Sequence, residues 1–304
     1  MNASTPKRLG LIGLGSFGQL TARHLRDHFE VIAADTADRS AEAAELDIRW
    51  GTAAEAAASP YVVLAVPVQS FATALESIRD HLRAGALVID VASVKLAPVR
   101  EMERLLPADV EIIGSHPLFG PQSAAAGLDG HRIVLCPLRT RRLEEVRGFL
   151  EQRLRLAVHV CDADTHDRDI AHTQALAQFV GRALAQLEQS GSPVRTPAYN
   201  RFQEVADTVG EDSWELFSAI QNLNPYAAGM RAELLARLND LQERLAEDAR
   251  ANAPHAAPSP SRGSEKQRPA GNARTAEPDA PAPRSSRADE KERRAAEGAG
   301  GDPD

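Results

Sequence analysis

Polar side chains follow two apolar segments near the middle of the chain. Ser93 and Lys95 come after the run 87–90, and His116 comes after the run 111–113. If both runs are parallel strands of one open sheet, the loops at their carboxyl ends border one crevice, where ligands bind. A hydroxyl, an ammonium and an imidazole would then meet in one place. Because an imidazole titrates near neutral pH, His116 is a candidate for moving a proton there.

Each of these three side chains also has a structural interpretation. Ser93 would cap the helix that follows it, and Lys95 would lie in solvent. His116 precedes a proline, which favours an extended segment, and its ring would bond a backbone carbonyl. We favour the chemical interpretation because the three residues follow two adjacent strands.

A glycine-rich turn near the start of the chain predicts which kind of ligand binds in this crevice. The strand-like run 9–12 precedes Gly13-Leu-Gly-Ser-Phe-Gly18, a helix-prone stretch follows, and the next strand ends in Asp35, 22 residues past the first glycine. This order is typical of dinucleotide binding: the glycines permit a tight turn and a close approach, and helix amides hold the pyrophosphate. The alternative is a glycine turn with no ligand. The expected cofactor-binding residues are Gly13, Leu14, Gly15, Ser16, Phe17, Gly18, Asp35, Val66, Pro67 and Ser93.

Asp35 bears on which dinucleotide binds. A carboxylate here accepts hydrogen bonds from ribose hydroxyls and repels a 2′-phosphate, which favours NAD. Arg39, four residues later, would serve a 2′-phosphate if the loop folded back, so NADP stays open.

Hydrophobic periodicity divides the chain into three regions. Strand-like and helix-like segments alternate over 1–162, which predicts a doubly wound, Rossmann-type α/β domain with a parallel sheet. Apolar residues recur at helical spacing over 163–250, which predicts a small all-helical domain for substrate binding and dimerisation. Its leucine stripe would pair with a second copy in a homodimer, the alternative being an intrachain hairpin. Residues 251–304 contain no Ile, Leu, Val, Phe, Trp or Tyr and are expected to be a disordered tail.

Composition excludes several classes of function. The net charge is -8 and basic residues form no cluster, so we expect no nucleic-acid partner. No apolar run approaches a membrane span, and segment 1–8 lacks the apolar core of a signal peptide, so we expect a soluble cytoplasmic protein. Cys136 and Cys161 are expected to be buried free thiols. We expect no metal site.

Four motifs resemble the prephenate/arogenate dehydrogenases of tyrosine biosynthesis. They are GLGSFG from Gly13, DVASVK from Asp90, GSHPLFGPQSA from Gly114 and THD from Thr165. The resemblance runs from about residue 7 to residue 246, and FGPQSA with GEDSWEL is most similar to the plant-type arogenate branch. It implies oxidative decarboxylation of prephenate to 4-hydroxyphenylpyruvate, or of arogenate to tyrosine, with a nicotinamide dinucleotide as hydride acceptor.

The resemblance also implies roles for individual residues. His116 would bond the substrate's 4-hydroxyl and accept its proton, and Ser93 would hold the same hydroxyl. Lys95 would have a supporting electrostatic role. The substrate-binding residues implied are Ser115, His116, Gln174, Gln178 and Arg201. Of these, Arg201 would clamp a substrate carboxylate, as in some members of the family.

One departure from the family pattern leaves the substrate open. Many members carry a histidine twelve residues past the histidine of the THD motif, where this chain has Gln178. An alternative substrate is therefore 4-amino-4-deoxyprephenate, which similar enzymes in antibiotic pathways use. Further alternatives are a Rossmann dehydrogenase acting on a 3-hydroxy acid and a sensor that binds NAD without turnover. Gln174 and Gln178 could also simply face solvent.

Overall fold

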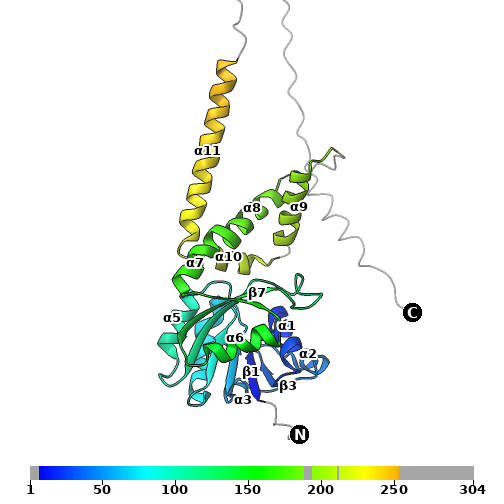
Figure 1. Ribbon diagram of the computed structural model, residues 1–304, viewed down its shortest axis with the longest axis vertical. Helices are drawn as coiled ribbons and strands as arrows, with labels where there is room; N and C mark the ends of the chain where they lie inside the picture. Colours follow the sequence, from blue (N-terminus) through cyan, green and yellow to red (C-terminus); the bar gives the residue numbers. More distant parts are fainter. Residues whose placement is uncertain (1–6, 188–193, 211, 253–304) are drawn as a thin grey trace, which may run out of the picture. The chain divides into compact units, whose positions relative to one another are not determined.

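A single eight-stranded sheet organises the first part of the protein. The computed structural model describes residues 7–187, 194–210 and 212–252. The strands lie in the order β3-β2-β1-β4-β5-β6-β7-β8 (Figure 1). They are β1 (Arg8–Ile12), β2 (Glu30–Ala34), β3 (Arg49–Trp50), β4 (Tyr61–Leu64), β5 (Leu87–Asp90), β6 (Glu111–Pro117), β7 (Arg132–Arg139) and β8 (Ala157–Val160). The Rossmann-type fold predicted from the sequence is confirmed.

The sheet departs from the expected pattern at β6 and β7. These two strands pair antiparallel, with His116 opposite Val134, whereas the other neighbouring strands pair parallel. Because β7 supplies partners as far as Pro117, strand β6 continues through Ser115 and His116. The expectation that these residues follow the strand was wrong, and His116 is held by the sheet ladder itself.

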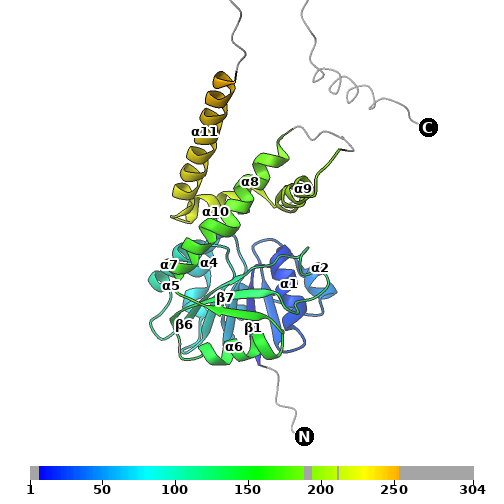
Figure 2. The ribbon, with the colours of Figure 1, turned by 45° about the horizontal axis from the view of Figure 1, so that its top comes forward.

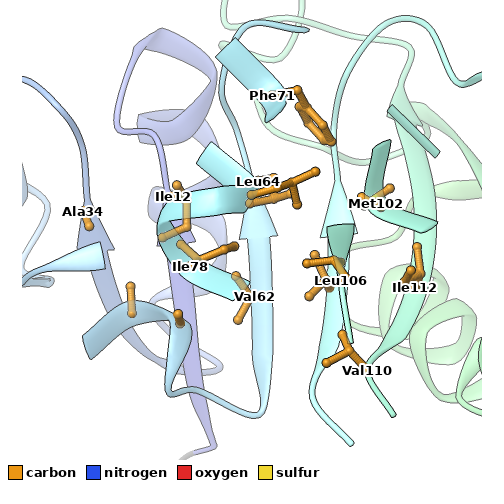
Figure 3. Packing of buried hydrophobic residues seen from close by; sticks show 14 of the residues in the cluster. Ile12, Ala34, Val62, Leu64, Phe71, Ile78, Met102, Leu106, Val110 and Ile112 are labelled. Carbon is orange, nitrogen blue, oxygen red and sulfur yellow. The ribbon is translucent and has the colours of Figure 1, made fainter. Parts of the chain in front are cut away.

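Helices cover both faces of the sheet, as the continuous apolar strands require. One face packs against α3 (Ala53–Ala57), α4 (Phe71–Ile78) and α5 (Leu96–Leu105), and Figure 3 shows that core around Leu64, Phe71 and Met102. The other face packs against α1 (Ser16–Leu25), α2 (Ser40–Glu45) and α6 (Leu143–Gln152). Short 3₁₀ turns at Val68–Ser70 (η1) and Arg79–His81 (η2) flank α4. The two apolar layers fix the strand ends that carry the polar residues.

The second part of the described chain is helical, as predicted. It comprises α7 (Ala163–Ile170), a π-helical turn at Ala171–Ala175 (η3), α8 (Leu176–Ala185), α9 (Pro197–Gly210), α10 (Trp214–Leu223) and α11 (Ala227–Ala251) (Figure 2). The turn η3 joins α7 and α8 into one run, and single π turns inside helices often occur at functional sites. The core here is small, with Ala175, Ile220, Ala227 and Met230 buried.

Several sequence-based expectations concern other features of the chain. The described residues up to Ala251 form one compact unit. The disordered tail was expected over 251–304, but Ala251 is still part of the last helix, and residues 253–304 lie outside the described residues. Among the described helices, none has both the length and the apolar composition of a bilayer span. Cys136 and Cys161 are both free, but only Cys136 is fully buried, and its burial raises the pKa of that thiol.

Candidate functional site

The glycine loop between β1 and α1 has the backbone that a pyrophosphate needs. Gly13 has a φ of +96°, and a Cβ there would lie 2.4 Å from the carbonyl oxygen of Ala65. A Cβ on Gly18 would lie 2.1 Å from the carbonyl oxygen of Gly13, so α1 approaches the loop too closely for a side chain. Gly15 caps α1 without a side-chain hydrogen bond, and no described atom lies within 4 Å of the Cβ position there. The loop therefore fits a phosphate group at the α1 N-terminus.

Other predicted cofactor residues surround this loop. Ser16 is exposed, and Phe17 is half-buried with its ring centroid 6.3 Å from that of Phe119. Val66 Cγ1 would lie 3.0 Å from a Cβ on Gly13, which brings the residues after β4 against the loop. Pro67 is exposed next to Val66.

Asp35 lies at the carboxyl end of β2, where a ribose would bind. Its carboxylate accepts hydrogen bonds from the amides of Leu14 (2.7 Å) and Ala37 (3.1 Å). Burial opposes ionisation of Asp35, but these amides and Arg39 outweigh it and lower the pKa. The carboxylate borders an open hollow of about 500 Å³, which Thr36, Asp38, Ser40 and Trp50 also line. Arg39 bonds Glu42 at 2.8 Å, and its Nε lies 4.0 Å from Asp35.

Lys95 and Asp90 form a fully buried ion pair between β5 and α5. Both residues are 0% exposed, and the Lys95 ammonium donates to Asp90 Oδ1 and to the carbonyl of Ser115. Burial raises the pKa of Asp90, against the opposing effect of Lys95. The solvent-exposed alternative for Lys95 is wrong, because its ammonium fastens β5 to the segment of β6 that carries His116.

Ser115 belongs to the same buried cluster. Its side chain donates to the carbonyl of Asp90 at 2.5 Å, and its amide donates to the Asp90 carboxylate at 3.3 Å. Ser115 is 1% exposed. In this structure the hydroxyl expected to bind substrate joins two strands. Ser93 is half-buried after β5.

His116 is the first of three polar side chains linked in a row. Its Nδ1 lies 2.9 Å from Nε2 of His166, and Nδ1 of His166 lies 2.8 Å from Oδ1 of Asp167. All three residues are at most 2% exposed. The structural interpretation required the ring of His116 to bond a backbone carbonyl. That interpretation is wrong, because Nδ1 of His116 contacts His166 of the THD motif instead.

This row determines which nitrogen of each ring carries a proton. An ionised carboxylate only accepts, so Nδ1 of His166 donates to Asp167, and in the neutral ring Nε2 of His166 is then the acceptor. Nδ1 of His116 then donates to His166, which leaves Nε2 of His116 as an unprotonated base. Nε2 makes no hydrogen bond to any described residue. Burial, followed by His166 and Lys95, lowers the pKa of His116 well below its ordinary value and favours the neutral, proton-accepting form.

Asp167 also connects the helical region to the sheet. Its carboxylate accepts from the amides of Lys95 (2.7 Å) and Leu96 (3.0 Å) at the start of α5. The capping group of α5 is thus Asp167, and the alternative that Ser93 caps this helix is wrong. Asn224 donates to the Asp167 carbonyl at 2.6 Å, which ties the loop before α11 to the same point.

The predicted substrate residues of the helical region are more scattered. Gln178 is 3% exposed and donates to the Asp212 carboxylate at 2.8 Å, so the alternative that it faces solvent is wrong. Gln174 is half-buried, and Arg201 is exposed on α9. Sequence reasoning missed Arg182, which donates to the Asp212 carbonyl and lies over the rings of Trp214 and Phe217. Its position four residues after Gln178 was the available signal.

Comparison with family models finds matches in two parts of the chain. Residues 21–157 match the model described as prephenate dehydrogenase, nucleotide-binding domain. This match, the curated relatives and the solved structures below all support the prephenate/arogenate dehydrogenase family for this chain. Residues 183–256 match a second model, described as TYRAAT1-like, C-terminal domain. These matches bracket the run that contains the THD motif, and the first supports a nicotinamide dinucleotide as cofactor.

Relatives within this family include two plant proteins. Arogenate dehydrogenase 1, chloroplastic, of Arabidopsis thaliana is 26% identical over 281 residues, which are 84% of this chain. Arogenate dehydrogenase 2, chloroplastic, of the same plant is 28% identical over 237 residues, 74% of this chain. The chain spans 44% of the length of the first relative and 66% of the second.

Solved structures of this family share the fold. Prephenate dehydrogenase from A. aeolicus, in complex with hydroxyphenyl propionate and NAD+, has a TM-score of 0.65 at 19% identity. The match covers 82% of this chain and 94% of that one. Synechocystis arogenate dehydrogenase has a TM-score of 0.57 at 21% identity, covering 81% and 98%.

Proposed function

We propose that the protein catalyses the NAD(P)-dependent oxidative decarboxylation of prephenate or arogenate, giving 4-hydroxyphenylpyruvate or tyrosine. The observation that carries the proposal is the buried row from Nδ1 of His116 through His166 to Asp167, from which we infer that Nε2 of His116 is an unprotonated base. The similarity to this family and to the plant arogenate dehydrogenases supports the reaction class. A cytoplasmic location goes with this role and stays a prediction from the sequence.

In the proposed reaction, a residue of this chain accepts one proton from the substrate and later returns it. When bound, the dinucleotide accepts a hydride from C4 of the substrate ring. Nε2 of His116 takes the proton of the 4-hydroxyl as its C–O bond becomes a carbonyl. The ring carboxylate then leaves as carbon dioxide, its bonding electron pair enters the ring, and the oxygen becomes a phenolate. His116 returns the proton to that oxygen, so no net proton is consumed.

Ser93 is proposed to orient the 4-hydroxyl beside His116, and Lys95 acts indirectly by fixing the backbone of β6. Gln174, Gln178 and Arg201 are proposed to contact the substrate from the helical region. Arg201 has a planar guanidinium suited to a carboxylate. Its exposure on α9 leaves it able to close on a ligand.

NAD is the proposed cofactor because Asp35 presents an ionised carboxylate to the hollow at the end of β2. A 2′-phosphate there would meet that negative charge. Arg39 is the feature that favours NADP as the alternative, since its Nε is buried and makes no hydrogen bond with the described residues.

The second candidate reaction is oxidation of 4-amino-4-deoxyprephenate. Gln178 favours it, because this residue replaces a titratable histidine of many relatives with a neutral amide. A sensor that binds dinucleotide without turnover is the third candidate.

The test is formation of reduced dinucleotide at 340 nm with prephenate, arogenate and 4-amino-4-deoxyprephenate in parallel, each with NAD and NADP. We expect turnover with prephenate or arogenate. Turnover with the amino analogue alone would select the second candidate. Dinucleotide binding without turnover on any of the three would select the sensor and contradict an enzymatic role.

We also propose a homodimer formed through the helical region. Leu235, Leu238, Leu241 and Leu245 of α11 are 50–65% exposed, and only Ala227 and Met230 of this helix are buried. In Figures 1 and 2 the later turns of α11 extend beyond the other described helices. Leucines at 234, 238, 241 and 245 follow the four-three spacing of a coiled-coil seam.

The mass in solution tests this proposal by light scattering. We expect a dimer, with Leu238→Glu giving monomers and Asn239→Glu, which adds the same charge one residue away, keeping the dimer. A wild-type protein that stays monomeric at micromolar concentration would contradict it.

A further inference from the structure

The proton taken by His116 has a second acceptor within hydrogen-bond distance. We propose that His116 passes a proton on to His166, where the carboxylate of Asp167 holds the resulting imidazolium. His166 is then a positioning and proton-storing residue, because it acts on the substrate only through His116. The inference rests on the proposed function, since it gives the destination of the proton in that reaction.

The hydrogen-bond row sets the direction of the transfer. As Nε2 of His116 gains the substrate's proton, the N–H bond at Nδ1 of His116 breaks. That proton moves across the 2.9 Å gap to Nε2 of His166, whose lone pair forms the new bond. His116 is neutral again, His166 is cationic, and Asp167 remains ionised at 2.8 Å from Nδ1 of His166. The reverse transfer returns the proton when the phenolate forms.

The charges around the two rings make His166 the better place for the cation. His116 is buried next to the Lys95 ammonium, which disfavours a positive charge on its ring. Asp90, from β5, is engaged by Lys95, and Cys136, from β7, is a neutral thiol whose pKa is raised. The only carboxylate that either ring contacts among the described residues is Asp167, and it contacts His166.

The position of Asp167 is fixed independently of the rings. Its two oxygens also accept from the amides of Lys95 and Leu96 at the start of α5, which stabilise a negative charge. An imidazolium that forms beside it is therefore paired at once, without movement of the backbone. A carboxylate that holds and stabilises an imidazolium without itself being protonated is an established role in other enzymes.

His166→Gln tests this role directly. An amide can still donate to Asp167 and accept from His116, but it cannot hold a second proton. We expect kcat to fall about 10- to 100-fold, with KM within about twofold of wild type. This loss is smaller than the roughly 10²–10⁴-fold typical of removing a general base, because His116 is still present. The acid limb of the kcat/KM profile should move to lower pH, because the remaining base is the buried His116.

His172→Gln is the matched control, because His172 is an exposed histidine on the same helical run. We expect it to keep the wild-type kcat and pH profile. A folded His166→Gln protein with wild-type kcat and an unmoved acid limb would show that His166 is only structural and overturn the inference.

Histidine NMR of the wild-type protein without substrate separates this inference from the proposed function. We expect the ring resonances of His116 and His166 to shift together, with one common midpoint, as for a pair that shares one proton. Two rings with unrelated midpoints in an active enzyme would overturn the relay and leave the function intact. If the two rings shift together in a protein that is inactive on all three substrates, the proposed function is refuted. The conclusion that His116 and His166 share a proton would still hold.

Discussion

The ends of β5 and β6 differ from the helical region in how their buried polar groups are hydrogen-bonded. At the ends of β5 and β6, Asp90, Lys95 and Ser115 all have hydrogen-bond partners. In the helical region, Gln178 Oε1, Gln174 Oε1 and Arg182 Nε are buried without a partner among the described residues. A buried polar atom without a partner costs free energy. We infer from this contrast that the ends of β5 and β6 are preorganised for chemistry, whereas the helical region acquires its contacts when substrate binds.

If this division holds, substitutions at the sheet should change kcat or stability, and substitutions in the helical region should change KM. His116→Asn carries the largest expected effect. It removes the general base, so kcat should fall about 10²- to 10⁴-fold, while dinucleotide affinity stays near wild type. Steady-state kinetics and a dinucleotide titration measure the two quantities. Wild-type turnover in this variant would remove His116 from the chemistry.

Lys95→Met tests whether the buried ion pair holds the site together. It leaves Asp90 buried without its cation, which should lower the free energy of unfolding by about 3–5 kcal/mol. The matched variant is Lys95→Met with Asp90→Asn, which removes both charges and should recover part of the loss. Urea unfolding measures both. Equal stability of Lys95→Met and wild type would mean that the pair contributes nothing to holding β5 and β6.

Asp35→Ser addresses the cofactor end of the sheet. Loss of a charged hydrogen-bond acceptor costs about 1.5–3 kcal/mol, so the preference for NAD over NADP should fall about 10- to 100-fold. The ratio of kcat/KM values for the two dinucleotides measures it. An unchanged ratio would mean that Asp35 supports only the Leu14 amide and does not select the ribose.

Gln178→Leu should have the smallest effect of these substitutions, and it should change KM instead of kcat. A single hydrogen bond contributes about 0.5–1.5 kcal/mol, so KM should rise about threefold to tenfold with kcat little changed. Gln186→Leu, at an exposed position beyond the end of α8, is the control and should match wild type. A drop in kcat instead of a rise in KM would break the proposed division between the two regions.

The same division describes what the sequence could predict. The Rossmann fold, the glycine loop and the helical second part followed from local periodicity and glycine spacing. Strand β3 has only two residues, Arg49 and Trp50, and is too short to give a periodic signal. The antiparallel pairing of β7, which extends β6 through His116, depends on a partner far along the chain.

Contacts between distant segments were the part that the sequence did not predict. The THD motif was noticed, but its link to His116 joins residues 50 positions apart and requires α7 to lie against β6. Lys95 was expected at the surface or in the crevice because charged side chains are rarely fully buried. Its burial depends on Asp90 and on the Ser115 carbonyl, which tertiary packing brings together.

The central claim is that His116 serves an oxidative decarboxylation. Stoichiometry tests it most directly: reduced dinucleotide, carbon dioxide and aromatic product are measured together in one reaction with the preferred substrate. The account predicts one of each per substrate consumed by the wild-type protein. Reduced dinucleotide formed without an equal amount of carbon dioxide would contradict it, because the hydride would then come from a different reaction.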